Sequence, residues 1–411
     1  MNARRPFVLH LFAIGILMAT HSLPAQNWML TTAPNFNWKG IACSADGTKL
    51  VAVMGGQGAT VGSIFISTNS GATWKITGAP TLRWECVTSS ADGTKLAAGA
   101  SGVNGTIYTS ADSGTTWTNR SVPHVNWASI ASSADGSKLI AAAGTFFSGP
   151  TGPVYTSADS GATWTSNNLP VAFWRAVATS ADGGKLIAMP YGQGSTIRPI
   201  YTSADSGTTW ATNILSGKSW SCAASSADGI NLAVASDPGG IYTSTNSGQS
   251  WTLAAGVPTG YYQFLTCSSD GSTLMAVTDY NNASTGPGPV FTSTNSGLNW
   301  VSNNLSGVFW QSAAVSSDGR KLVVAGVNNV FSMNGGHIYV SPPEVLLSSA
   351  LSNGLMVVSW PTTAAGFGLQ QNTDLTGTNW VTLTNAPVIT NGMNQIFLPT
   401  TNTNSFFRIK Q

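Results

Sequence analysis

The chain has 411 residues and few charged side chains: 17 Lys and Arg stand against 15 Asp and Glu, together 8% of the sequence. A nucleic-acid-binding protein needs a surplus of Lys and Arg to replace counterions along the phosphates, so this composition excludes DNA and RNA as partners. Only four histidines occur, and His124 and His337 are far apart. A zinc site built from imidazoles needs several that converge, so we expect neither a metal nor a cofactor.

Residues 1–25 have the pattern of a signal peptide. Arg4 and Arg5 precede an apolar run at 7–19, and Ala25 offers a small residue for cleavage. The run is too short to span a bilayer comfortably, although an uncleaved anchor is the alternative interpretation. We therefore expect an exported protein, extracellular, surface-bound or periplasmic, with no membrane span after removal of the leader.

Residues 26–341 consist of repeats. A Ser-Ala-Asp-Gly-like turn recurs every 42–48 residues, and an aromatic residue stands eight positions before each turn Asp. The second unit holds apolar runs at 85–89, 96–100, 106–109 and 117–119, separated by residues that favour tight turns. Four strands per unit of this length are typical of a β-propeller blade. The turn aspartates are Asp46, Asp92, Asp135, Asp182, Asp228, Asp270 and Asp318, which predicts seven blades.

The two ends of the repeat region complement one another. The seventh unit stops after Tyr339, without its last strand, whereas Trp28 precedes Trp38 by the ten residues that separate two units elsewhere. We therefore expect residues 27–33 to form the outer strand of the seventh blade and to close the ring, which leaves few exposed strand edges.

A second turn identifies a resemblance. It reads Ser-Ala-Asp-Ser-Gly-Thr-Thr-Trp at 110–117, and its relatives end at Trp74, Trp164, Trp210, Trp251 and Trp300. In this motif the chain resembles the Asp-box (bacterial neuraminidase repeat) β-propellers, with Asn replacing Asp in three copies. In those families the box is a structural turn away from the binding face, so the resemblance implies architecture and little about chemistry.

Residues 344–411 lack the repeat and carry short alternating runs that predict a small β-sandwich. Ser359-Trp360-Pro361, Gly366-Phe367-Gly368-Leu369-Gln370 and Phe406-Phe407-Arg408 resemble elements of the fibronectin type III-like C-terminal modules of exported Verrucomicrobia-like bacterial proteins. That resemblance implies a role in surface attachment.

Few carboxylates are available for catalysis. Outside the turns, the propeller region holds only Glu85, Asp237 and Asp279. Glycoside hydrolysis normally uses two facing carboxylates, so these three are the catalytic candidates, and solvated loop residues are the alternative interpretation. Sialidases also need an arginine triad, a Tyr–Glu pair and an early Arg-Ile-Pro motif. The nearest string here has Pro199 directly after Arg198, so we reject sialidase activity but keep the fold.

Four cysteines, Cys43, Cys86, Cys222 and Cys267, lie in the first strands of their units. Export permits disulfides between neighbouring blades, Cys43–Cys86 and Cys222–Cys267. Buried free thiols are the alternative.

The irregular loops lie opposite the regular turns and carry the less common residues. The residue after each leading aromatic should line the funnel on that face: Lys39, Glu85, Ala128, Arg175, Ser221, Gln263 and Gln311. The predicted ligand-binding residues are Lys39, Glu85, Arg175, Tyr191, Arg198, Asp279 and Tyr280, since rings and polar groups together suit a carbohydrate or a peptide. Packing of the aromatic residues over the blade tops is the alternative.

The sequence therefore predicts an exported, monomeric, non-catalytic propeller that binds a polysaccharide or an extracellular protein and is surface-associated through its C-terminal module. Similar repeats in photosystem assembly-factor propellers add to the protein-binding hypothesis. The alternative is an extracellular glycoside hydrolase or lyase that uses Glu85, Asp237 or Asp279.

Overall fold

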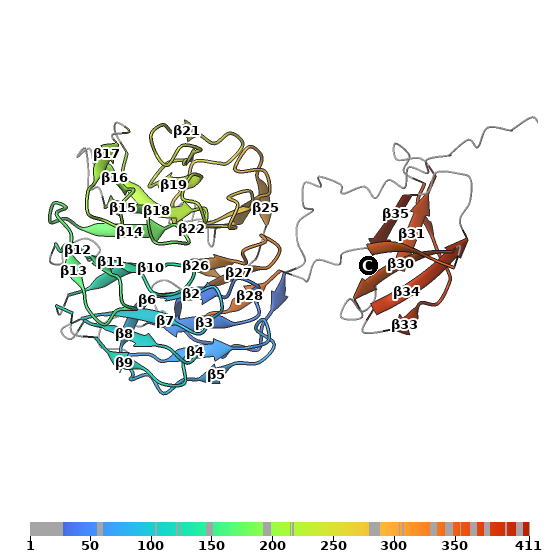
Figure 1. Ribbon diagram of the computed structural model, residues 1–411, viewed down its shortest axis with the longest axis horizontal. Helices are drawn as coiled ribbons and strands as arrows, with labels where there is room; N and C mark the ends of the chain where they lie inside the picture. Colours follow the sequence, from blue (N-terminus) through green and yellow to red (C-terminus); the bar gives the residue numbers. More distant parts are fainter. Residues whose placement is uncertain are drawn as a thin grey trace, which may run out of the picture. The chain divides into compact units, whose positions relative to one another are not determined.

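The structure is a computed structural model of the chain (Figure 1). It describes residues 28–410 apart from 56–60, 103–104, 121, 124, 145–150, 192–198, 214, 216–217, 279–287, 304, 306–307, 329–334, 342–347, 354, 362–367, 374–378, 391–392 and 400–405. Every regular element within these residues is a β-strand. The chain divides into two compact units, Ser22–Pro342 and a second that holds Pro343–Gln411.

The first unit repeats one four-stranded antiparallel sheet, and seven such sheets fall within its described residues. Six of them take their strands in chain order: β2 (Trp38–Cys43), β3 (Leu50–Met54), β4 (Ile64–Ser67) and β5 (Lys75–Ile76); β6 (Arg83–Ser89), β7 (Leu96–Ser101), β8 (Ile107–Ser110) and β9 (Thr118–Asn119); β10 (Trp127–Ser132), β11 (Leu139–Ala143), β12 (Val154–Ser157) and β13 (Thr165–Ser166); β14 (Trp174–Thr179), β15 (Leu186–Pro190), β16 (Ile200–Ser203) and β17 (Ala211–Asn213); β18 (Trp220–Ser225), β19 (Leu232–Ser236), β20 (Ile241–Ser244) and β21 (Thr252–Leu253); β22 (Tyr262–Cys267), β23 (Leu274–Thr278), β24 (Val290–Ser293) and β25 (Val301–Asn303).

The remaining sheet of this unit combines the two ends of the repeat region. It orders β1 (Met29–Leu30), β28 (Ile338–Val340), β27 (Leu322–Val327) and β26 (Phe309–Val315). Met29 pairs with Val340 and Leu30 with Tyr339 in an antiparallel register. The N-terminal strand therefore lies where the sequence places the missing outer strand of the last repeat.

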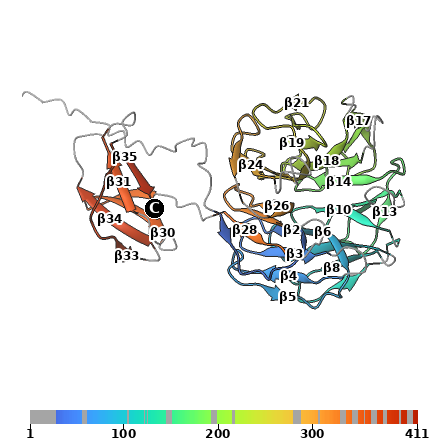
Figure 2. The ribbon, with the colours of Figure 1, turned by 180° about the vertical axis from the view of Figure 1, so that it is seen from behind.

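The first strands of the sheets gather around a common centre, and the fourth strands lie at the periphery (Figure 1; Figure 2 from behind). A chain of backbone hydrogen bonds links neighbouring sheets at this centre. The Ala45 N–H donates to the Ala91 carbonyl at 2.7 Å, equivalent bonds follow from sheet to sheet, and the Ser317 N–H donates back to the Ala45 carbonyl at 2.7 Å. The series thus returns to the sheet in which it starts.

Apolar clusters between neighbouring sheets form the core of this unit. The leading aromatic of each sheet is almost fully buried; Trp84, for example, lies in one cluster with Val51, Val53 and Ile64 of the preceding sheet. The same kind of cluster joins Trp38 and Phe65 of the β2–β5 sheet to Ile338 of β28. Burial of the leading aromatic residues and of apolar strand residues between neighbouring sheets therefore holds the sheets together.

Both regular turns lie on one face, as their positions after the first and third strands predict. In the turn before β7, the Ser90 hydroxyl donates to Asp92 Oδ1 at 2.5 Å. In the second turn of the same sheet, Ser113 adopts a φ of +58°, and its N–H donates to the Thr94 carbonyl at 2.8 Å. The Thr116 N–H donates to Asp112 Oδ1 at 2.8 Å. In each turn the Asp side chain thus accepts hydrogen bonds from neighbouring turn residues, in place of backbone acceptors. We call this surface the turn face.

The second unit contains two antiparallel sheets. One orders β29 (Ser348–Ser352), β30 (Leu355–Pro361), β34 (Met393–Pro399) and β33 (Val388–Thr390), and the other orders β32 (Val381–Thr382), β31 (Gly368–Asn372) and β35 (Phe406–Lys410). Val358, Trp360, Leu369, Ile396 and Leu398 from both sheets form one buried cluster. The strand expected from the Ser-Trp-Pro element is β30, with Trp360 in this core.

The four cysteines are free thiols, so the disulfide alternative is not realised. Cys222 is buried and the other three are partly buried. Burial raises the pKa of each thiol to about 12, which makes them small, unreactive core residues. Among the described residues, no helix has the length and apolar character needed to cross a membrane.

Candidate functional site

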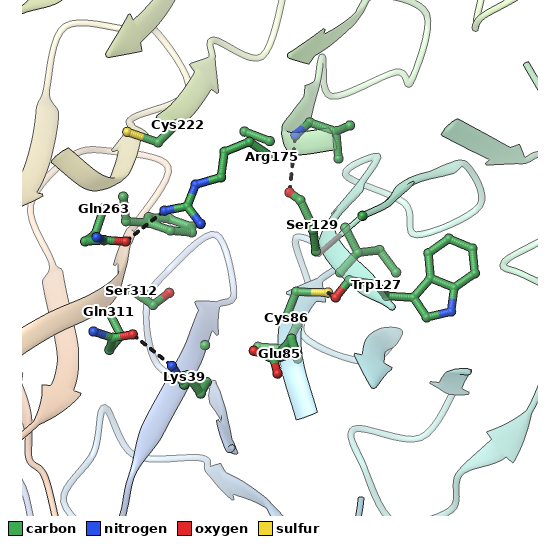
Figure 3. Close-up of a pocket in the computed structure, with 18 of the residues that line it drawn as sticks. Lys39, Glu85, Cys86, Trp127, Ser129, Arg175, Cys222, Gln263, Gln311 and Ser312 are labelled. Carbon is green, nitrogen blue, oxygen red and sulfur yellow. Dashed lines mark hydrogen bonds between the residues drawn. The ribbon is translucent and has the colours of Figure 1, made fainter. Parts of the chain in front are cut away.

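The first strands of the sheets enclose a cavity of about 700 Å³ (Figure 3). Its lining includes the residue that follows the leading aromatic in every sheet: Lys39, Glu85, Ala128, Arg175, Ser221, Gln263 and Gln311. The fold brings these residues together because each occupies the same position in its repeat. These residues stand near the starts of the first strands, whereas the regular turns follow the ends of those strands, and we call this end of the sheets the cavity face.

Two cations of the lining are positioned by neutral amides. Lys39 Nζ on β2 donates to Gln311 Oε1 on the neighbouring β26 at 3.2 Å. Arg175 on β14 donates through a terminal guanidinium nitrogen to Gln263 Oε1 on β22 at 2.8 Å. Arg175 thereby reaches past β18, where the equivalent residue, Ser221, is small and 2% exposed. Figure 3 shows both pairs pointing into the cavity. An amide acceptor fixes a cationic group without neutralising it.

Glu85 is held on the opposite side of the cavity from Gln263 (Figure 3). The Ser101 hydroxyl donates to Glu85 Oε1 at 2.7 Å, and the Arg83 guanidinium lies 3.6 Å from the same oxygen. Nearby, the Gly102 N–H donates to Asn126 Oδ1 at 2.6 Å. The carboxylate therefore has two polar partners within the protein and is the single acidic group among the described residues of the lining.

Asp237 and Tyr191 lie beside Arg175 but are not lining residues. Asp237 directly follows β19, and its N–H donates to the Ser219 carbonyl at 2.7 Å. Burial raises the pKa of Asp237, and the nearby Arg175 partly offsets that rise. Burial, followed by the charge of Asp237, also raises the pKa of Tyr191. Arg175, Asp237 and Tyr191 thus form one electrostatic group at the edge of the cavity.

The predicted site residues separate into three sets. Lys39, Glu85 and Arg175 line the cavity, and Asp237 and Tyr191 adjoin Arg175. Arg198, Asp279 and Tyr280 lie outside the described residues. Sequence reasoning missed Arg83 and Asn126, which also line the cavity. Both directly precede a leading aromatic, so that register position is the signal that could have found them.

Paired-carboxylate catalysis has few candidate groups among the described lining residues. A glycoside hydrolase normally places two carboxyl groups about 5–10 Å apart across the scissile bond, whereas the described lining presents Glu85 alone. The described residues also contain no group of three or more His, Cys, Asp or Glu side chains that could hold a metal ion.

No protein-family model matches the sequence, and no curated protein matches it. Solved structures do match. The GH74 xyloglucanase from Xanthomonas campestris aligns with a TM-score of 0.56 at 13% identity, over 82% of this chain and 59% of that chain. YCF48 from Cyanidioschyzon merolae aligns with a TM-score of 0.54 at 14% identity, over 77% and 98% of the two chains. YCF48 bound to D1 peptide aligns with a TM-score of 0.55 at 14% identity, over 79% and 98%.

The chain thus spans 59% of the length of the matched xyloglucanase. At these identities the likeness concerns architecture and not activity. Together with the repeated four-stranded antiparallel sheets, it shows that the first unit is a β-propeller.

Proposed function

We propose that the chain is an exported, non-catalytic, seven-bladed β-propeller that binds a segment of an extracellular protein in its central cavity. The ring is closed by β1, the second turns are Asp boxes, and the C-terminal unit is a fibronectin type III-like module that attaches the protein to a surface. The pairing of β1 with β28 and the cyclic series of backbone hydrogen bonds support the closed ring.

One observation carries the binding function. The seven positions after the leading aromatic residues are equivalent by repeat and share one cavity, yet they hold Lys, Glu, Ala, Arg, Ser and Gln side chains. Positions that only maintain a repeat fold can keep one residue type, as the turn Asp does. An asymmetric ligand requires such differences among the positions that line one cavity.

The described lining favours a polypeptide ligand over a neutral sugar. Sugar sites commonly present exposed aromatic rings on which the apolar sugar faces stack. The aromatic residues of the described lining are Trp127, which is 1% exposed, and the partly buried Phe264. Amide, hydroxyl and charged groups dominate instead, and these match the backbone and side chains of a peptide. One of the aligned structures is YCF48 bound to D1 peptide, so a peptide ligand has a precedent among the structural neighbours.

Export rests on the pattern of residues 1–25, and it predicts a mature chain that starts after Ala25. Secretion of the full-length chain followed by N-terminal sequencing tests it. An unprocessed N-terminus on a protein retained inside the cell would contradict export.

The binding function can be tested with two matched alanine-to-tryptophan variants of one sheet. Ala128→Trp places a bulky side chain in the lining of the cavity, whereas Ala162→Trp places the same side chain at an exposed position of the turn face. A library of random twelve-residue peptides is selected on the wild-type chain, and the recovered peptides are measured on both variants. We expect Ala128→Trp to abolish binding and Ala162→Trp to leave it unchanged.

Two results would contradict this function. Recovered peptides that bind both variants equally would place binding outside the cavity. The second result concerns the alternative hypothesis of a glycoside hydrolase or lyase. Under that hypothesis, polysaccharides incubated with the chain would release reducing ends, and the release would depend on Glu85, Asp237 or Asp279. Release that disappears in Glu85→Gln would make the protein an enzyme.

A further inference from the structure

The two faces of the propeller differ in charge. Ten aspartates lie in the regular turns, and all ten are exposed: Asp46, Asp92, Asp112, Asp135, Asp159, Asp182, Asp205, Asp228, Asp270 and Asp318. Six cations accompany them there, Lys49, Lys95, Lys138, Lys185, Lys321 and the exposed Arg320, and the five lysines are partly buried. The turn face is therefore acidic.

The described lining of the cavity has the opposite sign. The described residues of its lining include three cations, Lys39, Arg83 and Arg175, and one acid, Glu85. With Asp237 counted beside Arg175, positive groups still outnumber negative ones. Because charges inside a concave, partly desolvated site are screened less than surface charges, the field at the cavity mouth attracts anions.

The positions of the cavity's cations indicate how they could contact a negatively charged ligand. Arg175 and Lys39 point into the cavity from different sheets (Figure 3), each oriented by the side-chain oxygen of a glutamine. Glu85 is engaged by Arg83 and Ser101. The two amide-positioned cations are thus arranged to meet two separate carboxylates of one extended ligand.

We propose that the peptide segment bound in the cavity is acidic, and that Arg175 and Lys39 recognise its Asp or Glu carboxylates. This inference rests on the proposed peptide-binding function and adds the chemistry of the partner. The acidic turn face repels the same segment, so the asymmetry orients its approach toward the cavity.

The test uses the full mature chain and three labelled, N-acetylated and C-amidated peptides: hexaglutamate, hexaglutamine and hexalysine. Fluorescence anisotropy should show binding of hexaglutamate alone. Binding should weaken as salt is raised, because salt screens the long-range attraction between the cavity and an acidic peptide. A charged hydrogen bond contributes enough that Arg175→Gln should weaken hexaglutamate binding about tenfold or more.

Variants of both signs make the test specific. Lys39→Gln should also weaken hexaglutamate binding. Because Lys39 is distant in the sequence from Arg175, this variant still tests the inference if Arg175→Gln disturbs Asp237 and the fold. Glu85→Gln removes the acid of the lining and should strengthen binding about threefold. Lys138→Gln, a charge change of the same size on the turn face, should leave binding unchanged.

Each other outcome overturns the inference in a distinct way. Hexaglutamine or hexalysine binding as tightly as hexaglutamate, with sensitivity to Ala128→Trp, would refute the acidic ligand but leave peptide binding intact. Hexaglutamate binding that neither Arg175→Gln nor Lys39→Gln weakens would refute the assigned residues. Labelled polygalacturonate serves as a fourth probe, and its binding without hexaglutamate binding would assign the cavity to an acidic glycan. Binding of none of the four probes would refute the acidic segment.

Discussion

The turn face and the cavity face are built from the same repeats but use them in opposite ways. On the turn face each sheet carries an Asp that accepts a hydrogen bond from the Ser two residues earlier, as in Ser44 to Asp46 and Ser316 to Asp318. On the cavity face the equivalent positions differ, from Lys39 to Glu85 to Ala128. The repeated residues thus build the turns, whereas the residues that line the cavity differ from sheet to sheet.

The turn face also shows how neighbouring sheets are fastened. At five junctions a Lys three residues after the turn Asp lies over the turn Gly of the next sheet. Lys138, for example, packs on Gly183 and donates to Ser206 Oγ at 3.2 Å. Gly183 has a φ of +66°, and a Cβ there would meet the Lys138 chain. Two junctions lack this lysine and use Asn231 and Thr273 instead.

The largest effect should come from the core that both faces share. Trp220 is fully buried between two sheets and does not line the cavity. Trp220→Ala should lower the free energy of unfolding by about 3–5 kcal/mol, as expected for a buried tryptophan, in chemical denaturation. Leu298→Ala, at a position that is 72% exposed, is the control. A loss below about 1 kcal/mol for Trp220→Ala would contradict the packing of the sheets.

The second-largest effect on stability should come from acid, through protonation of the turn aspartates. Hydrogen bonds from Ser90 and from the Thr94 backbone lower the pKa of Asp92 from 3.8 to about 2, and equivalent bonds lower the pKa of Asp46 and Asp135 to about 2. A pKa that is lower in the folded state contributes stability above pH 4, and this contribution is lost as pH falls toward 2. Thermal unfolding should therefore show a melting temperature that drops between pH 4 and 2. A flat profile would contradict these bonds.

Each lysine that packs on the turn Gly of the next sheet should contribute less to the free energy of unfolding. Lys138→Met keeps most of the apolar stem but removes the hydrogen bond to Ser206 and the attraction to Asp182. We expect a loss of about 0.5–1.5 kcal/mol in the free energy of unfolding, with unchanged hexaglutamate binding. Weaker binding in this variant would show that the turn face takes part in recognition.

Introducing a lysine at a junction that lacks one tests the same contribution from the other side. Asn231→Lys would supply a fastening lysine at a junction that lacks one, within reach of Asp270. Because exposed ion pairs contribute little, the expected gain is about 0.5 kcal/mol or less, measured as a rise in melting temperature. A clear loss of stability would mean that the Asn231 bond to the Asp270 carbonyl is the better fastening.

The smallest effect on stability should come from the cavity. Gln263→Ala removes the acceptor that positions Arg175, and it should change the free energy of unfolding by less than about 0.5 kcal/mol while weakening hexaglutamate binding severalfold. Gln249→Ala, in an exposed turn of the same molecule, is the matched control. Equal effects of both variants on binding would contradict a positioning role for Gln263.

Much of this architecture could be predicted from the sequence because turn chemistry and apolar periodicity are local. The turn residues and leading aromatics predict four strands per unit, and the trimmed seventh unit predicts the pairing of β1 with β28. The alignment of seven repeats also predicts that Lys39, Glu85 and Arg175 share one cavity, as they do in the structure.

The rest depends on tertiary geometry. That Arg175 passes β18 to reach Gln263 depends on the small Ser221 between them, and no local pattern reports that contact. Asp237 was predicted as a possible catalytic residue, but the structure places it outside the lining and beside Arg175. The choice between disulfides and free thiols likewise depends on the three-dimensional structure, in which all four cysteines are free.

Hydrogen exchange of the full chain with and without hexaglutamate tests the division between the two faces most directly. We expect added protection of backbone amides around Lys39, Arg175 and Gln311, with unchanged exchange in the turns at Asp46 and Asp112. Protection of the turn face with an unchanged cavity would contradict this division.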